Sequence, residues 1–252
     1  MGVNIAIAGK GGTGKTTITG LLLRNLKETG RVPILAVDAD PNSCLPVVLG
    51  LKAENTIGRM IAGFIDNKDN VPSGMTKDLY IEMQINKLLI EGDNLDLLVM
   101  GRGEGAGCYC YANVILRKFI DNLANSYKYV VIDNEAGLEH LSRRLTDRID
   151  FLLLVSDYSI KGVKTIEQIM EIISELKLDI KSKGLIVNRA PVDMDEKILD
   201  AVARTGINLL GGIPFDEKIS DFDLQEIPLL ELPERSPSNL AAKDIIKNLS
   251  LI

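Results

Sequence analysis

The stretch at residues 3–17 constrains the fold more than any other part of the chain. An apolar run, VNIAIA (3–8), leads directly into GKGGTGKTT (9–17), and residues with helical spacing follow at 16–29. A strand, a glycine-rich loop and a helix in this order surround an anion with backbone N–H groups and a helix N-terminus. The sequence therefore predicts a phosphate-binding loop.

Further apolar runs of strand length follow along the chain, and most are continuous, as in strands covered by helices on both faces. They are PILAV (33–37), LDLLVM (95–100), YVVID (129–133), FLLLVS (151–156), GLIVN (184–188) and INLLGGI (207–213). Segments with helical spacing lie at 16–29, 112–125, 160–176, 195–204 and 238–249. We expect a single α/β domain over residues 1–252, a P-loop NTPase with a mostly parallel, doubly wound sheet flanked by helices.

The interval 51–94 is less regular than the rest. Asn, Asp, Pro and Gly gather at 66–74, and a helix is expected from about 76 to 90. We interpret this interval as an insertion on the core and a candidate docking element.

Composition limits the cellular location and the binding partners that we expect. The 252 residues are 46% hydrophobic and 25% charged with a net charge of −6, so the chain has no general attraction for nucleic acid. No apolar run approaches the roughly 20 residues of a membrane span, and the first residues lack the basic segment of a signal peptide. We expect a cytoplasmic protein that binds neither membrane nor nucleic acid.

The phosphate loop assigns roles to its residues. Its glycines let the backbone wrap around phosphate oxygens, Lys15 would reach the β- and γ-phosphates, and Thr16 would ligate Mg²⁺. The loop residues expected to contact the nucleotide are Gly11, Gly12, Thr13, Gly14, Lys15, Thr16 and Thr17.

Aspartates stand at the ends of two other expected strands, in AVDADP (36–41) and VVIDNEAG (130–137). A buried aspartate at such a position needs a cation or several hydrogen-bond donors, so Asp38 and Asp133 are candidates for holding Mg²⁺, directly or through water. For Asp38 and Asp40 the alternative is that they are acidic turn residues closing a strand.

A second lysine, Lys10, lies inside the loop, where an ordinary phosphate loop needs none. GKGGTGKTT resembles the deviant Walker A loop of the SIMIBI class of nucleotide-driven dimers, which includes the nitrogenase iron protein, MinD and ParA. The resemblance implies a homodimer in which Lys10 reaches the partner's nucleotide. It also implies that Asp40 is the switch I aspartate acting on the attacking water, and that Gly137 is the switch II hinge. The alternative for Lys10 is a solvent-exposed loop lysine.

The same resemblance implies base contacts from Asn188, Arg189 and the segment around Pro214. The guanine-reading Asn-Lys-x-Asp pattern is missing, because Arg189, Ala190 and Pro191 follow Asn188. ATP is therefore favoured over GTP. The alternative for Asn188 is a helix or turn cap.

Two of the three cysteines stand close together in GAGCYCYAN (105–113). Side chains two residues apart in an extended segment point the same way, so Cys108 and Cys110 can present two thiolates to one ion. One such pair supplies half of a four-thiolate site, and a two-fold dimer would supply the other half. The alternative is two packed thiols, and packing is also our interpretation of Cys44.

The combination of GKGGTGKTT, VDADPNSC, GCYC and IDNEAGLEHLSRR (132–144) resembles the CooC/AcsF group of ATPases. The resemblance implies an ATP-hydrolysing metallochaperone that holds Ni²⁺, or Zn²⁺ in its place, between paired Cys108 and Cys110 segments. Its client would be carbon monoxide dehydrogenase or acetyl-CoA synthase, and the sequence does not say which.

Two other functions stay open. One is an ATP-dependent iron–sulfur reductase or cluster carrier, weakened because His140 stands about where such reductases carry their second cysteine. The other is a MinD- or ParA-like positional switch that binds membrane or DNA. Against it, the tail 238–252 contains only two lysines and indicates a docked closing helix better than a basic membrane anchor.

Overall fold

The computed structural model describes residues 2–66, 71–102, 117, 119–120, 122–135, 148–176 and 178–249. Cys108, Cys110, Gly137 and His140 lie outside these residues, and so does half of the helix expected at 112–125.

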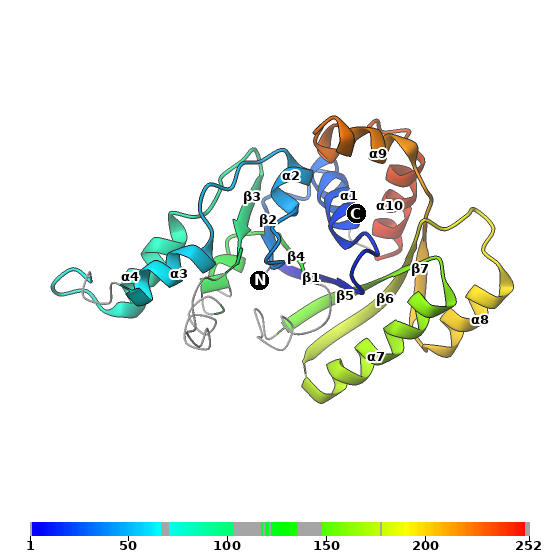
Figure 1. Cartoon of the computed structure of the whole chain (residues 1–252), viewed down its shortest axis with the longest axis horizontal. Helices are drawn as coiled ribbons and strands as arrows, with labels where there is room; N and C mark the ends of the chain where they lie inside the picture. The colour runs from blue at the N-terminus through cyan, green and yellow to red at the C-terminus, as the bar shows by residue number, and fades with distance from the viewer. Residues whose placement is uncertain are drawn as a thin grey trace.

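A seven-stranded sheet runs through the molecule (Figure 1), in the order β3-β2-β4-β1-β5-β6-β7. Every pairing between these strands is parallel. The strands are β1 (Val3–Gly9), β2 (Ile34–Asp38), β3 (Leu95–Val99), β4 (Tyr129–Asp133), β5 (Arg148–Asp157), β6 (Asp179–Asn188) and β7 (Asn208–Ile213). The predicted doubly wound α/β fold is confirmed, and the pairings among these seven strands are parallel throughout.

Helices cover both faces of the sheet. They are α1 (Lys15–Glu28), α2 (Leu45–Leu49), α3 (Ile57–Asp66), α4 (Lys77–Asn86), α7 (Ile160–Leu176), α8 (Glu196–Arg204), α9 (Glu217–Leu224), the 3₁₀ turn η1 (Leu229–Glu231) and α10 (Pro237–Asn248). One face packs against α1, α2 and α10, and the other packs against α3 and α4 at one end and α7 and α8 at the other. Alternate residues of β2 serve the two faces: Ile34 and Ala36 point to the first, Leu35 and Val37 to the second.

The helices of the interval 51–94 are part of the covering layer. Ile57 and Ile61 of α3 and Ile81 and Ile85 of α4 are buried against the apolar faces of β2, β3 and β4. The expected helix at 76–90 ends at Asn86, and Ile90 instead forms an isolated antiparallel bridge with Leu97. A docking role for this interval stays a prediction.

The closing helix is docked on the first helix. Ile245 and Ile246 of α10 are buried in the same cluster as the apolar face of α1. The Asn25 side-chain amide of α1 donates to the Asn239 side-chain oxygen of α10 at 2.8 Å, and both residues are buried. Within the described ranges, no helix combines the length and the apolarity needed to cross a membrane.

The packing of α4 gives a stability prediction. Ile85 is fully buried, so Ile85→Ala removes apolar contacts and leaves a cavity, and we expect the free energy of unfolding to fall by about 2–5 kcal/mol. Leu79 on the same helix is 53% exposed, so Leu79→Ala should change it by no more than about 0.5 kcal/mol. Urea unfolding checks both. Equal effects of the two substitutions would show that α4 does not pack as described.

Candidate nucleotide-binding site

The phosphate loop lies in the middle of the sheet at the carboxyl ends of the strands. β1 pairs with β4 on one side and β5 on the other, so the loop after β1 opens at the point where the chain changes its winding direction. Open parallel sheets bind their ligands in this crevice. The position agrees with a nucleotide site.

The loop has a fixed backbone shape. Gly12 and Gly14 have φ values of 79° and 88°, which glycine adopts without strain. The Thr13 hydroxyl donates to the Lys10 carbonyl oxygen at 2.8 Å, closing the turn. At Gly14, an added Cβ would lie 2.2 Å from Nδ2 of Asn188, so only glycine fits there.

Lys15 is placed for an anion. Its side chain is buried at the start of α1, and its Nζ lies 3.5 Å from the carbonyl oxygen of Lys10. Burial lowers the pKa of the Lys15 ammonium, and the carboxylates of Asp133, Asp40 and Glu135 act in the opposite direction. A phosphate placed here would add the negative charge that this desolvated ammonium favours.

Two buried carboxylates face the loop from neighbouring strands. Asp38 ends β2, Asp133 ends β4, and the two are paired in the sheet register. The Thr19 hydroxyl donates to Asp133 at 3.2 Å, and the Thr16 side chain also hydrogen-bonds to it. Burial raises the pKa of Asp133 to about 6 and that of Asp38 to about 7. Two desolvated carboxylates beside a threonine hydroxyl are a donor set that suits Mg²⁺.

Asp38 also fastens the loop between β2 and α2 (residues 39–44), here called the switch I loop. One carboxylate oxygen accepts from the Asp40 N–H and the other from the Leu45 N–H, both at 3.0 Å. Within the loop, the Asn42 N–H and side-chain amide donate to Asp40 Oδ1 at 2.8 and 2.9 Å. The shape of the loop and the position of Asp40 therefore depend on Asp38 and Asn42.

Asn188, at the end of β6, contacts the phosphate loop. Its side-chain amide donates to the Thr13 carbonyl oxygen at 2.8 Å. The next residue, Arg189, is exposed with a φ of 55° and lines a cavity of about 210 Å³ together with Thr17 of α1 and Phe222 of α9. Pro214 follows β7 and is half-buried. Base contacts from these residues remain a prediction.

The remaining candidate residues are one loop lysine and the three cysteines. Lys10 is exposed on the loop, as its proposed role across an interface requires. Cys44 is exposed, so our assignment of this residue to packing is wrong; its thiol lies 3.9 Å from the Asn42 carbonyl oxygen. The metal site expected at Cys108 and Cys110 falls outside the described residues.

Sequence reasoning missed three polar residues of the site. Thr19 stands one helical turn after Lys15 and is fully buried, a spacing that could have identified it. Asn42 follows Asp40 by two residues, the usual spacing of an Asx turn. Asn134 donates its side-chain amide to the Ile7 carbonyl oxygen at 2.9 Å, and no local pattern indicates that contact.

Comparison with known proteins identifies the family. Residues 5–229 match the family described as the CobQ/CobB/MinD/ParA nucleotide binding domain. The chain belongs to this family. This CobQ/CobB/MinD/ParA-type domain is 44% identical over 235 residues to an uncharacterized ATP-binding protein of Methanocaldococcus jannaschii, covering 92% of each chain. It is 30% identical over 234 residues to the carbon monoxide dehydrogenase accessory protein CooC of Rhodospirillum rubrum, covering 88% of this chain and 87% of that one.

Solved structures agree on the fold. The cell division ATPase MinD of Pyrococcus furiosus superposes with a TM-score of 0.73 at 23% identity, covering 100% of this chain and 99% of that one. MinD of Pyrococcus horikoshii, solved as a complex with Mg-ADP, superposes with a TM-score of 0.71 at 24% identity, covering 99% and 96%.

The raised pKa of Asp133 predicts a pH-dependent stability in the nucleotide-free CobQ/CobB/MinD/ParA-type domain. The folded-state pKa of about 6 lies above the ordinary value of 3.8, so the folded chain binds the proton more tightly than the unfolded chain. This contribution is complete below about pH 4 and is lost as the pH rises through 6. An asparagine in its place would not ionise, and Thr19 could still donate to the amide oxygen. We expect Asp133→Asn to be more stable than the wild type by about 1–3 kcal/mol at pH 8, with little difference at pH 4.5.

Thermal unfolding of both proteins across this pH range checks the prediction. Tyr80→Phe on α4 serves as a control at a residue far from the site in sequence and should show no such trend. A difference between Asp133→Asn and the wild type that is the same at every pH would contradict it.

Proposed function

We propose that this protein is an ATP-hydrolysing metallochaperone. It binds Ni²⁺, or Zn²⁺ in its place, through paired Cys108 and Cys110 segments of a homodimer and assists nickel insertion into carbon monoxide dehydrogenase or acetyl-CoA synthase. One observation carries the proposal: a chain with a nucleotide site of this geometry is 30% identical over 88% of its length to a carbon monoxide dehydrogenase accessory protein. The Cys-x-Cys pair in the sequence supplies the metal ligands.

ATP binding follows from the loop and the residues around it. Lys15 and the loop N–H groups bind the phosphates, and Thr16 with Asp38 and Asp133 would hold Mg²⁺, directly or through water. Mg²⁺ bound there would neutralise charge that develops on the phosphates during hydrolysis. Asn188 holds the loop at Thr13 while the nucleotide enters.

Hydrolysis requires a water and a positive charge. Asp40, held by Asn42, positions or deprotonates the attacking water. Lys10 is exposed and can reach the nucleotide of a second copy, where it stabilises negative charge in the transition state. Loss of the γ-phosphate releases the switch loops, and the change in dimer geometry alters the affinity of the paired cysteines for nickel.

The role of Lys10 predicts a change in hydrolysis without a change in folding. Because Lys10 is exposed, Lys10→Ala should unfold at the same temperature as the wild type, while its ATP turnover number falls by about 10- to 1,000-fold. Lys197→Ala, at another exposed lysine, is the matched control and should keep full activity. Wild-type activity in the Lys10 variant would exclude the proposed role in trans.

The metal site is tested by anaerobic Ni²⁺ titration. We expect the wild type to bind one ion per two chains, and Cys108→Ser/Cys110→Ser to lose that binding because its thiolates are gone. Cys44→Ser removes an exposed cysteine from the switch I loop and should keep it. Stoichiometry and mass are measured with and without ATP.

The other outcomes separate the competing functions. Brown, iron-containing protein with charge-transfer absorbance would support a cluster carrier instead. Colourless protein that ignores nickel but sediments with liposomes in the presence of ATP would support a positional switch. Nickel binding indifferent to ATP and to both cysteines would end the metallochaperone proposal.

A further inference from the structure

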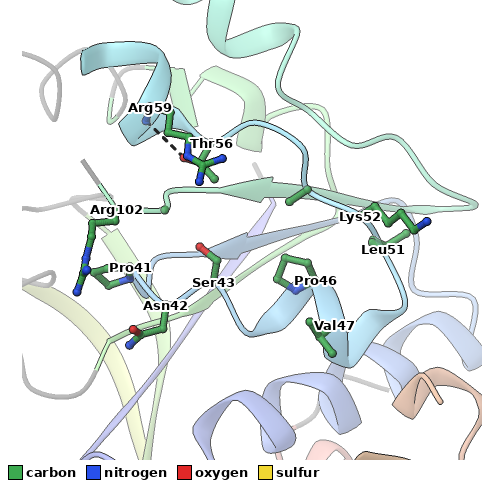
Figure 2. A pocket seen from close by; sticks show the side chains of 12 residues that line it. Pro41, Asn42, Ser43, Pro46, Val47, Leu51, Lys52, Thr56, Arg59 and Arg102 are labelled. Atoms are coloured by element: carbon green, nitrogen blue, oxygen red, sulfur yellow. Dashed lines mark hydrogen bonds between the residues drawn. The ribbon is translucent and has the colours of Figure 1, made fainter. Parts of the chain in front are cut away.

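A second cavity, of about 660 Å³, lies behind the switch I loop (Figure 2). Its walls come from this loop, from α2 and the chain that follows it, from the start of α3, and from the residues after β3. The residues that line it are Pro41, Asn42, Ser43, Pro46, Val47, Leu51, Lys52, Ala53, Thr56, Arg59, Gly101 and Arg102. Its size is that of a cavity that holds a small ligand or a few residues of a peptide.

The cavity is basic, although the chain carries a net charge of −6. Lys52, Arg59 and Arg102 line it, and no aspartate or glutamate of the described ranges does. None of these three cations appears in an ion pair among the residues that the structure describes. Figure 2 shows Arg59 and Arg102 on one side of the cavity and Lys52 at its far end. This charge favours an anionic occupant.

Backbone contacts join the two segments that carry the exposed Arg59 and Arg102. The Gly58 N–H at the start of α3 donates to the Met100 carbonyl oxygen after β3 at 2.8 Å. Gly101 has a φ of 64°, and a Cβ there would lie 2.4 Å from the Thr56 side chain, so the two segments meet closely. Arg59 and Arg102 are therefore carried by segments fixed to each other before any ligand arrives.

The cavity is connected to the nucleotide site through β2. The Met100 N–H donates to the Asp38 carbonyl oxygen at 2.8 Å, and the Asp38 carboxylate holds both ends of the switch I loop. Asn42 lines the cavity and also donates two hydrogen bonds to Asp40. An occupant that displaces Asn42 therefore displaces Asp40.

Among anionic ligands, a peptide suits the residues that line the cavity best. In the part of the chain that the structure describes, no aromatic ring lines the cavity to stack on a nucleotide base, and Pro46, Val47 and Leu51 form an apolar wall away from Arg102 (Figure 2). Carboxylates pair with arginine in bidentate fashion, and an extended peptide can place its carboxylates on the arginine side while its backbone lies along the apolar wall.

We propose that this cavity binds an acidic peptide segment of a partner protein and that its occupation changes the rate of ATP hydrolysis through Asn42 and Asp40. The inference rests on the ATPase part of the proposed function and not on nickel.

Binding is tested with a fluorescein-labelled hexaglutamate peptide and the full-length protein, by fluorescence anisotropy. We expect Arg59→Glu/Arg102→Glu to weaken binding by at least about tenfold, because both bidentate pairs are lost and the charge is reversed. Lys197→Glu/Arg204→Glu makes the same change in net charge at exposed positions of α8 and should weaken binding by less than about twofold. Equal losses in the two double variants, or none in the first, would overturn the proposal.

Coupling is tested by ATP turnover. The peptide should change the wild-type turnover number at least about twofold and leave that of Arg59→Glu/Arg102→Glu unchanged, while basal hydrolysis is the same in both. Displacement of the peptide by inorganic phosphate at equal concentration would show a site for free anions. Tighter binding of an oligothymidylate that the same variant loses would show a nucleic-acid surface. Either result would overturn a peptide site.

The two proposals fail separately. If the wild type does not hydrolyse ATP at all, the proposed function fails and the anisotropy data still decide whether the cavity binds the peptide. If it hydrolyses ATP but does not bind the peptide, only the further inference fails.

Discussion

The structure depends on two carboxylates buried side by side where parallel strands end. Asp38 and Asp133 are 0% and 1% exposed and face each other across adjacent strands. Such burial is unfavourable unless hydrogen bonds and positive charge surround the carboxylates. The chain provides Lys15 and two threonine hydroxyls from α1 and two backbone N–H groups from the switch I loop and its junction with α2. The first helix and that loop are therefore held at the same point.

As a result of this arrangement, the two sides of the switch I loop have different neighbours. The side facing the phosphate loop carries Asp40, and the opposite side, Pro41 to Ser43, lines the basic cavity. A loop of six residues closed by a single carboxylate has few independent ways to move. Asp40 and the residues that line the cavity thus belong to one short loop held by the Asp38 carboxylate.

Much of the fold could be predicted because the sheet is buried on both faces. All seven strands are expected from apolar runs, but β5 and β6 begin earlier than predicted, since the first residues of β6 are mostly polar and exposed. The prediction omits α2, α3 and α9. Of these, α9 buries no residue and so leaves no periodic pattern, while α3 lies in the interval interpreted as an irregular insertion. In the site, the loop glycines and the aspartates at the strand ends could be predicted, because each belongs to a short contiguous sequence pattern. The Asn188 contact with Thr13 and the shared cavity of Arg59 and Arg102 bring together segments far apart in the chain, and spacing alone contains no sign of them.

The hydrogen bond between Asn25 and Asn239 joins the helix that begins at the phosphate loop to the closing helix α10. Both side chains are buried, and the Asn25 side-chain amide also donates to the Leu21 carbonyl oxygen at 2.9 Å. During synthesis on a ribosome, residues 15–28 emerge long before residues 237–248. Until α10 has been translated, the apolar face of α1 that packs against it stays exposed. A chain interrupted before that point would therefore expose apolar surface next to an otherwise complete phosphate loop. The helix that begins at the phosphate loop is thus covered by a segment more than 200 residues away in the chain.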